Sequence, residues 1–254
     1  MIIAEKKNDS ELMMLVPSIK NHMSEWQIIN INIVENSVLS QKEIIKHFYD
    51  QYRKYEGMIY PVSPRKIVML IRLGIIENYA VIKSDIEQKI PNHCCRILLR
   101  QMSKIGIKQV QIDLTEKDTS INLTESMYKQ RETRKDNVIL IVDDDPFIRK
   151  TMSILLTSCG EIIEASCGKE VVPAYLKHNP DILLLDIHMP DKTGLEIIPD
   201  LIELDSDSFI IVLSADSQKE NVLKALELGA AGFLTKPPAR EKIQEYLSQC
   251  ITIQ

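Results

Sequence analysis

The sequence VILIVDDDP, residues 138–146, is a run of five branched apolar side chains that ends in three aspartates and a proline. Four more short apolar runs follow, at intervals long enough for a helix between them: Ile162–Ala165, Ile182–Leu185, Phe209–Leu213 and Gly232–Leu234. Short apolar runs that alternate with helical segments are typical of buried strands in a parallel sheet with helices on both faces. Residues 137–254 are therefore predicted to form an α/β doubly wound domain with a five-stranded parallel sheet.

Polar side chains stand directly after four of these runs, where the ligand site of such a sheet is expected. They are Asp143, Asp144 and Asp145 after the first run, Asp186 after the third, Ser214 after the fourth and Lys236 after the fifth. Crowded carboxylates repel one another unless a cation neutralises them, and Mg²⁺ prefers carboxylate and phosphate oxygens. The pattern predicts Mg²⁺-assisted phosphoryl chemistry on a carboxylate, with the lysine and the serine hydroxyl holding the remaining phosphoryl oxygens.

The three aspartates have a second interpretation when they are taken alone. A carboxylate before a proline commonly caps a helix N-terminus, with the proline in the first turn. That interpretation is the better one for an isolated DDDP sequence. Polar residues at the ends of four strands together favour the phosphoryl site.

The segments IVDDDP (141–146), LLLDIHMPDKTG (183–194), VLSA (212–215) and FLTKP (233–237) resemble, in order and spacing, the receiver domain of two-component response regulators. The resemblance covers residues 137–254. It implies that Asp186 accepts a phosphoryl group from a sensor histidine kinase or a phosphotransfer protein, and that the domain catalyses only its own phosphorylation and dephosphorylation. It also implies the other roles in the site: Mg²⁺ ligands Asp143, Asp144, Asp186 and the His188 carbonyl, phosphate partner Lys236, and switch residues Ser214 and Phe233.

Two residues depart from this pattern. Asp145 is an acid beyond the pair that the motif requires, so no direct metal role is expected for it. Thr193 stands where many relatives carry an acid before the glycine, at a position away from the chemistry. The imidazole of His188 is expected at the surface, because a Mg²⁺ site built from oxygens gains little from it.

Residues 61–115 show a different pattern. Helix signals bound segments at Pro64–Leu73, Asp85–Ile90 and His93–Ile105, and Ile107–Leu114 alternates as a strand does. Helix, short helix, longer helix and strand is the order of a winged helix-turn-helix, and this mostly α-helical segment resembles winged-helix regulators.

The third of these predicted helices carries the DNA-binding hypothesis. Basic side chains gather on one side of it and just beyond: His93, Arg96, Arg100, Lys104 and Lys108. No acidic residue occurs between Gln88 and Ile112, which is the charge pattern of a phosphate-contacting surface. The alternative is an ordinary core helix with a solvated basic face.

The rest of the chain completes the predicted organisation. Residues 1–60 are a mainly helical extension, with a strand at Ile29–Ile33 and a capped helix from Ser40 to about Tyr55 whose aromatic face could serve dimerisation. Residues 116–136 have few large apolar side chains and are predicted to be a linker, with a short helix near its end.

Composition sets the outer limits. Hydrophobic residues make up 44% and charged residues 26% of the 254, which excludes a disordered or fibrous chain. Residues 1–136 hold 21 Lys and Arg against 17 Asp and Glu, whereas residues 137–254 hold 10 against 19. A basic half and an acidic half suit a polyanion partner and a cation site, or simply two unrelated domains.

Location and function follow as expectations. Five cysteines without a C-x-x-C pair favour reduced thiols, and no secretory leader or membrane span is evident, so a cytoplasmic protein is expected. The predicted function is a phosphorylation-controlled DNA-binding transcription regulator, assembled as a homo-oligomer. Its output-first order is similar to that of the regulator of nitric-oxide-responsive phosphorelays. Two alternatives are an N-terminal half that binds a signalling protein, and an N-terminal enzyme, which lacks a recognisable nucleophile–base pair.

Overall fold

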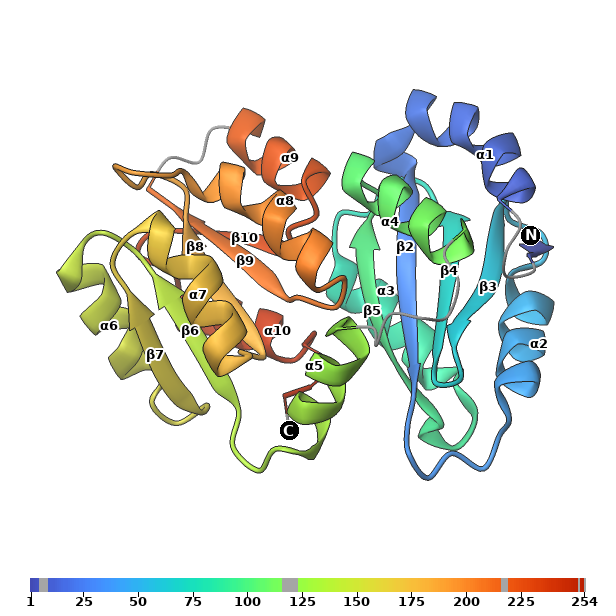
Figure 1. The fold of residues 1–254 in the computed structure, drawn as a ribbon, viewed down its shortest axis with the longest axis horizontal. Helices are drawn as coiled ribbons and strands as arrows, with labels where there is room; N and C mark the ends of the chain where they lie inside the picture. The colour runs from blue at the N-terminus through green and yellow to red at the C-terminus, as the bar shows by residue number, and fades with distance from the viewer. Residues whose placement is uncertain (5–8, 116–122, 216–218, 251, 254) are drawn as a thin grey trace. The chain divides into compact units, whose positions relative to one another are not determined.

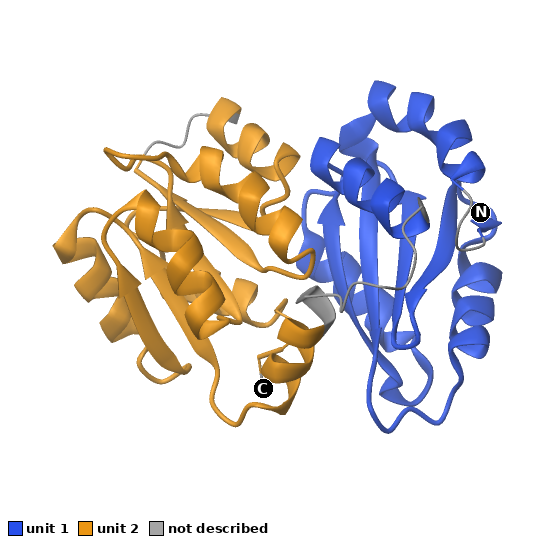
Figure 2. Ribbon diagram, viewed as in Figure 1, with its two compact units in different colours: residues 1–119 blue, residues 120–254 orange. Residues whose placement is uncertain are grey.

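The computed structural model describes residues 1–4, 9–115, 123–215, 219–250 and 252–253. The chain divides into two compact units, residues 1–119 and residues 120–254 (Figure 2). Within the described residues, every helix is too short or too polar to cross a lipid bilayer.

The N-terminal unit is built on a five-stranded mixed sheet in the order β1-β3-β4-β2-β5. Its strands are β1 (Ile2–Ile3), β2 (Trp26–Ile33), β3 (Gly57–Ser63), β4 (Lys66–Arg72) and β5 (Cys95–Gln101). The short β1 runs parallel to β3, and the other neighbours are antiparallel. The succession β2-α2-β3-β4-α3-β5 is that of a split βαβ unit, to which β1 and two further helices are added.

Helices cover both faces of this sheet (Figure 1). The helices are α1 (Ser10–Asn21), α2 (Gln41–Tyr52), α3 (Tyr79–Gln88) and α4 (Lys104–Thr115), with 3-10 turns η1 (Met23–Glu25) and η2 (Pro91–His93). Side chains of α2 and α3 pack with Ile29, Ile67 and Ile97 in one buried cluster. Side chains of α1 and α4 pack with Trp26 and Tyr60 in a second cluster, on the other face.

Two predicted elements of this unit are confirmed, and a third is confirmed in part. The strand Ile29–Ile33 lies within β2. The predicted helix Asp85–Ile90 overlaps only the end of α3, which begins at Tyr79 with Asn78 as its cap and ends at Gln88. The capping box of Ser40 and Glu43 opens α2.

The other three elements are wrong, so the winged helix-turn-helix is not the fold of this unit. Pro64–Leu73 is mostly strand β4, His93–Ile105 contains strand β5, and Ile107–Leu114 lies in helix α4. The cause is a shared periodicity: residues four apart, such as Arg96 and Arg100, lie on one side of a helix and also on one side of a strand. In β4 the apolar run is buried on both faces and has no period at all.

The second unit has the predicted five-stranded sheet, all of it parallel, in the order β10-β9-β8-β6-β7. Its strands are β6 (Val138–Val142), β7 (Glu161–Ala165), β8 (Ile182–Asp186), β9 (Ile210–Ser214) and β10 (Gly232–Thr235). Its helices are α5 (Leu123–Thr133), α6 (Pro146–Leu156), α7 (Gly168–His178), α8 (Gly194–Leu204), α9 (Lys219–Glu227) and α10 (Arg240–Leu247). The order reverses at β6, between β7 and β8, and in such sheets this switch point opens the ligand crevice at the carboxyl ends of the strands.

Helix α5, predicted as a short helix of the linker, is a fixed part of the second unit. The Arg131 Nη2 atom lies 2.6 Å from Asp205 Oδ2 and 2.9 Å from the Tyr175 hydroxyl, which itself donates to Asp205 at 2.7 Å. All three residues are buried. Burial alone would raise the pKa of Asp205, but the charge of Arg131 and the hydrogen bond from Tyr175 hold it below its usual range.

Candidate active site at the carboxyl ends of the parallel strands

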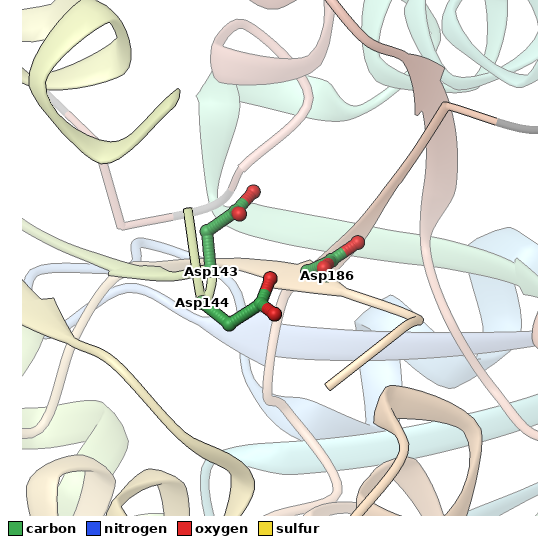
Figure 3. Close-up of side chains that lie close together, drawn as sticks. All are labelled: Asp143, Asp144 and Asp186. Atoms are coloured by element: carbon green, nitrogen blue, oxygen red, sulfur yellow. The ribbon is translucent and has the colours of Figure 1, made fainter. Parts of the chain in front are cut away.

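Three carboxylates meet where strands β6 and β8 end (Figure 3). Asp143 and Asp144 follow β6, and Asp186 is the last residue of β8. One oxygen of each lies within 4.8 Å of the others. Because Val142 pairs with Leu185 in parallel register, the next residues along, Asp143 and Asp186, emerge side by side.

One lysine, Lys236, forms ion pairs with two of these acids. Lys236 Nζ lies 2.6 Å from Asp143 Oδ2 and 2.9 Å from Asp186 Oδ1. Its backbone N–H donates to the Ser214 carbonyl at 2.9 Å, which fixes the loop after β10 beside the end of β9. The ammonium therefore lies between the carboxylates at the ends of β6 and β8.

The charges of this cluster do not balance. Asp143 and Asp186 are buried, Asp144 is exposed, and one ammonium faces the three carboxylates. Burial raises the pKa of Asp143 and outweighs the lowering effect of Lys236. Burial works against the charge of Lys236 too, but its contacts with Asp143 and Asp186 raise its pKa. An oxygen-rich cluster with excess negative charge fits a hard divalent cation such as Mg²⁺.

The remaining predicted residues surround this cluster. Ser214 ends β9 and is fully buried, and Phe233 is half-buried in β10. The His188 side chain is exposed, which confirms the predicted surface position of the imidazole. Gly194 allows the loop after β8 to approach closely, since a Cβ there would lie 2.2 Å from the Asp186 carbonyl oxygen.

The DDDP sequence supplies both a helix cap and two acids of the cluster. Asp145 caps helix α6: its Oδ1 accepts from the Phe147 N–H at 2.8 Å, and Pro146 occupies the first turn. Its own N–H donates to Asp143 Oδ1 at 3.0 Å. Asp145 is thus a capping residue that orients Asp143, and its carboxylate is outside the three-acid cluster.

Two residues that shape the site, Arg149 and Asp191, were not predicted from the sequence. Arg149 donates to the backbone carbonyl of Asp143 at 2.7 Å and to that of Asp144 at 3.2 Å. Asp191 accepts from the N–H groups of Gly168 and Lys169 at 2.8 and 2.9 Å. These bonds lower the pKa of Asp191 to about 2 and join the loop after β8 to the start of α7. Asp191 follows a proline in a turn, which is a usable signal; Arg149 carries none.

The residues predicted to bind DNA do not share one helix. Arg96 and Arg100 lie in strand β5, where Arg100 is only 6% exposed. His93 lies in η2, and Lys104 and Lys108 lie in α4 with exposed side chains. The hypothesis of a recognition helix with a basic face is therefore wrong in its geometry.

A parallel sheet with three acids, a lysine and a buried serine at its carboxyl edge defines a phosphoacceptor domain of the two-component type. Comparison with known proteins identifies it: residues 139–248 match the response regulator receiver domain, and the chain belongs to the response regulator receiver family. It is therefore a two-component response regulator. Receiver domains of this family generally depend on Mg²⁺ and interact with histidine kinases or phosphotransfer partners.

Relatives match less than half of the chain. The chemotaxis protein CheY of Thermotoga maritima is 35% identical over 113 residues, which are 44% of this chain and 94% of CheY. The nitrate/nitrite response regulator NarL of Escherichia coli K12 is 34% identical over 114 residues, 44% of this chain and 53% of NarL. Among solved structures, the CheX–CheY–BeF₃–Mg²⁺ complex from Borrelia burgdorferi is 37% identical, with a TM-score of 0.42, covering 44% of this chain and 87% of that chain.

Proposed function

We propose that Asp186 accepts a phosphoryl group from a phosphohistidine and that this modification regulates the N-terminal unit. An Asp186 carboxylate oxygen attacks phosphorus, an oxygen–phosphorus bond forms, and the phosphorus–nitrogen bond to the donor imidazole breaks. The observation that carries the proposal is the Lys236 ammonium, 2.9 Å from Asp186 and 2.6 Å from Asp143, which is placed to hold a phosphoryl oxygen.

The acids around Asp186 fit the metal that the family requires. Asp143, Asp144, Asp186 and the backbone carbonyl of His188 would hold Mg²⁺, which when bound neutralises charge on the phosphoryl oxygens. Ser214 would donate its hydroxyl to the phosphoryl group, and Phe233 would follow it inward. The only reactions that we propose for this chain are the phosphorylation and dephosphorylation of its own Asp186.

The phosphorylation test uses the full chain with acetyl phosphate and Mg²⁺, followed by intact-mass measurement under conditions that preserve acyl phosphates. The wild type gains one phosphoryl group, and Asp186→Asn gains none. The matched control is Asp145→Asn, because asparagine still caps a helix and Asp145 lies outside the acid cluster. Equal labelling of Asp186→Asn and wild type would overturn the assignment.

For the output, we propose that the N-terminal unit binds a signalling protein. Its sheet has helices on both faces, and the two arginines expected to contact DNA lie in strand β5. Such a layered α/β unit presents exposed helix surfaces, and protein partners commonly bind to surfaces of this kind. Affinity capture of a defined signalling protein by the full chain, with and without phosphorylation and with an excess of a free receiver domain as competitor, tests it. Capture that the free receiver abolishes would overturn binding by the N-terminal unit, and unchanged capture in both states would overturn phosphorylation control.

Control of DNA binding and transcription, with homo-oligomer formation, is the second proposal. The support for transcription control is one relative, the transcriptional regulatory protein KdpE of Mycobacterium tuberculosis, which is 35% identical over 39% of this chain and 44% of KdpE. Gel-shift assays over a salt series would show weaker binding for Lys104→Ala and Lys108→Ala, whose side chains are exposed. Wild-type chain that shifts no duplex at low salt in either phosphorylation state would exclude this proposal.

A further inference from the structure

Strand β10 is an edge strand, and one of its residues turns its backbone polar groups away from the sheet. Among the strands that the structure describes, β9 is the single neighbour of β10. Lys236 donates its N–H to Ser214 across this pair, so even-numbered residues face β9 and Phe233 faces outward. An unpaired backbone N–H and C=O at a sheet edge need another partner.

The Tyr246 hydroxyl is that partner. It accepts from the Phe233 N–H at 3.3 Å and donates to the Phe233 carbonyl oxygen at 3.3 Å. A phenol can do both because it is donor and acceptor at once. The side chain of helix α10 thus takes the place that a sixth strand would have at this residue.

The Tyr246 ring is fixed against the same strand. A Cβ at Gly232 would lie 2.1 Å from Tyr246 Cε1 and 2.4 Å from Cζ, so the ring rests on the bare backbone of that glycine. Gly232 directly precedes Phe233. The ring and the hydroxyl together therefore join α10 to the two residues at the start of β10.

The other contacts of helix α10 with the sheet are apolar. Ile243 is buried, and Ile243 and Leu247 lie against strand residues that include Ile182 and Ile211. Such packing has no fixed direction, whereas the Tyr246 hydroxyl bonds both polar backbone groups of Phe233. Tyr246 is therefore the directional contact between α10 and strand β10.

We propose that Tyr246 is a positioning residue that couples Phe233 to helix α10, so that α10 shifts when Asp186 is phosphorylated. The inference rests on the proposed function, in which Phe233 follows Ser214. The path runs from Asp186 through the Ser214 and Lys236 contacts to β10, and from Phe233 through the Tyr246 hydroxyl to α10.

The test compares backbone amide shifts of the full chain before and after addition of beryllium fluoride and Mg²⁺. In the wild type, the amides of Ser214, Phe233 and residues 240–247 all move. In Tyr246→Phe, which keeps the ring on Gly232, Ser214 and Phe233 still move, while the shifts of residues 240–247 fall by about half or more. Gly232→Ala displaces the Tyr246 ring by a change in strand β10, and it should reduce the amide shifts of residues 240–247 to the same extent.

The matched control is Glu245→Gln, which removes the exposed ion pair of Lys242 and Glu245 within α10 but leaves Tyr246 intact. It should behave as the wild type. Residues 240–247 that move equally in the wild type and in Tyr246→Phe would overturn the coupling and leave the proposed function standing. If the amide shifts of Ser214 and Phe233 in the wild type do not change on addition of beryllium fluoride, the proposed function is overturned, and this inference with it.

Discussion

The second unit holds two buried groups of charges, one at each end of its parallel sheet, and they are built differently. At the carboxyl ends of the strands, Lys236 is paired with Asp143 and Asp186, and Asp144 lies in the same cluster. At the amino ends, Arg131 is paired with the buried Asp205, to which the Tyr175 hydroxyl also donates, and Arg134 is paired with the buried Asp181. The first group leaves negative charge uncompensated, and the second provides one arginine for each of these two carboxylates.

The pKa directions of the two buried aspartates show what this difference means. Burial raises the pKa of both, yet the pKa of Asp143 ends above its usual range and that of Asp205 below it. Arg131 is committed to Asp205, whereas Lys236 is shared between Asp143 and Asp186. An incompletely compensated carboxylate is suited to a cation and to chemistry, and a compensated one is suited to holding elements together.

The largest effect is expected at the compensated group. Arg131→Met leaves the Asp205 carboxylate buried and unpaired, which should lower the free energy of unfolding by about 3–5 kcal/mol in urea titrations. The matched control is Lys192→Met, which breaks the exposed pair of Lys192 and Asp200 and should cost less than about 1 kcal/mol. Equal losses for the two variants would show that helix α5 is not anchored through Arg131.

The active-site group should respond in the opposite direction. Asp143→Asn removes an undercompensated buried carboxylate and should raise the free energy of unfolding by about 0.5–2 kcal/mol in metal-free buffer. Added Mg²⁺ should stabilise the wild type and not the variant, so the gap narrows. A variant that is less stable than the wild type without Mg²⁺ would contradict the assigned charge excess.

Acid titration should separate the groups further. The folded-state pKa of Asp205 is lowered from its usual 3.8, so its stabilisation is complete above pH 3.8 and is lost as the pH falls through the folded value. Arg131→Met lacks this contribution and should lose less stability than the wild type over the same acid range. Thermal unfolding measured between pH 5 and acid pH gives both slopes, and parallel curves would count against the ion pair.

The site could be predicted almost completely from the sequence, because it is assembled by strand ends. The residues that follow the strands of a parallel sheet lie at one edge of it. The apolar runs predict the strands, so they also predict that Asp143, Asp186 and Lys236 lie close together. The contacts of Arg149 were not predictable, since a backbone carbonyl acceptor leaves no sign in the sequence. The buried Arg131 group joins residues far apart in the chain and was equally hidden.

The N-terminal unit shows where sequence patterns fail. The wrong predictions concern β4 and β5, whose side chains are buried by helices on both faces of the sheet. A strand that is covered on both sides loses the alternation that identifies it, and basic residues four apart then suggest a helix. The elements that were predicted correctly, α2 and β2, carry a local signal: a capping box in the first and strict alternation in the second.

The smallest effect is expected at Asp191, which lies close to the active site but is exposed. Asp191→Asn keeps one acceptor oxygen, whereas the carboxylate accepts from the N–H groups of Gly168 and Lys169 with separate oxygens.

Because these bonds lower the pKa of Asp191 from 3.8 to about 2, the stabilisation by Asp191 is complete above pH 3.8 and fades as the pH falls towards 2. The variant should therefore lose slightly in melting temperature at neutral pH and match the wild type near pH 2. Asp200→Asn, at an exposed acid that is paired with Lys192, is the control and should show no such convergence. A constant difference between Asp191→Asn and wild type at all pH values would mean that the loop after β8 is held by something other than this carboxylate.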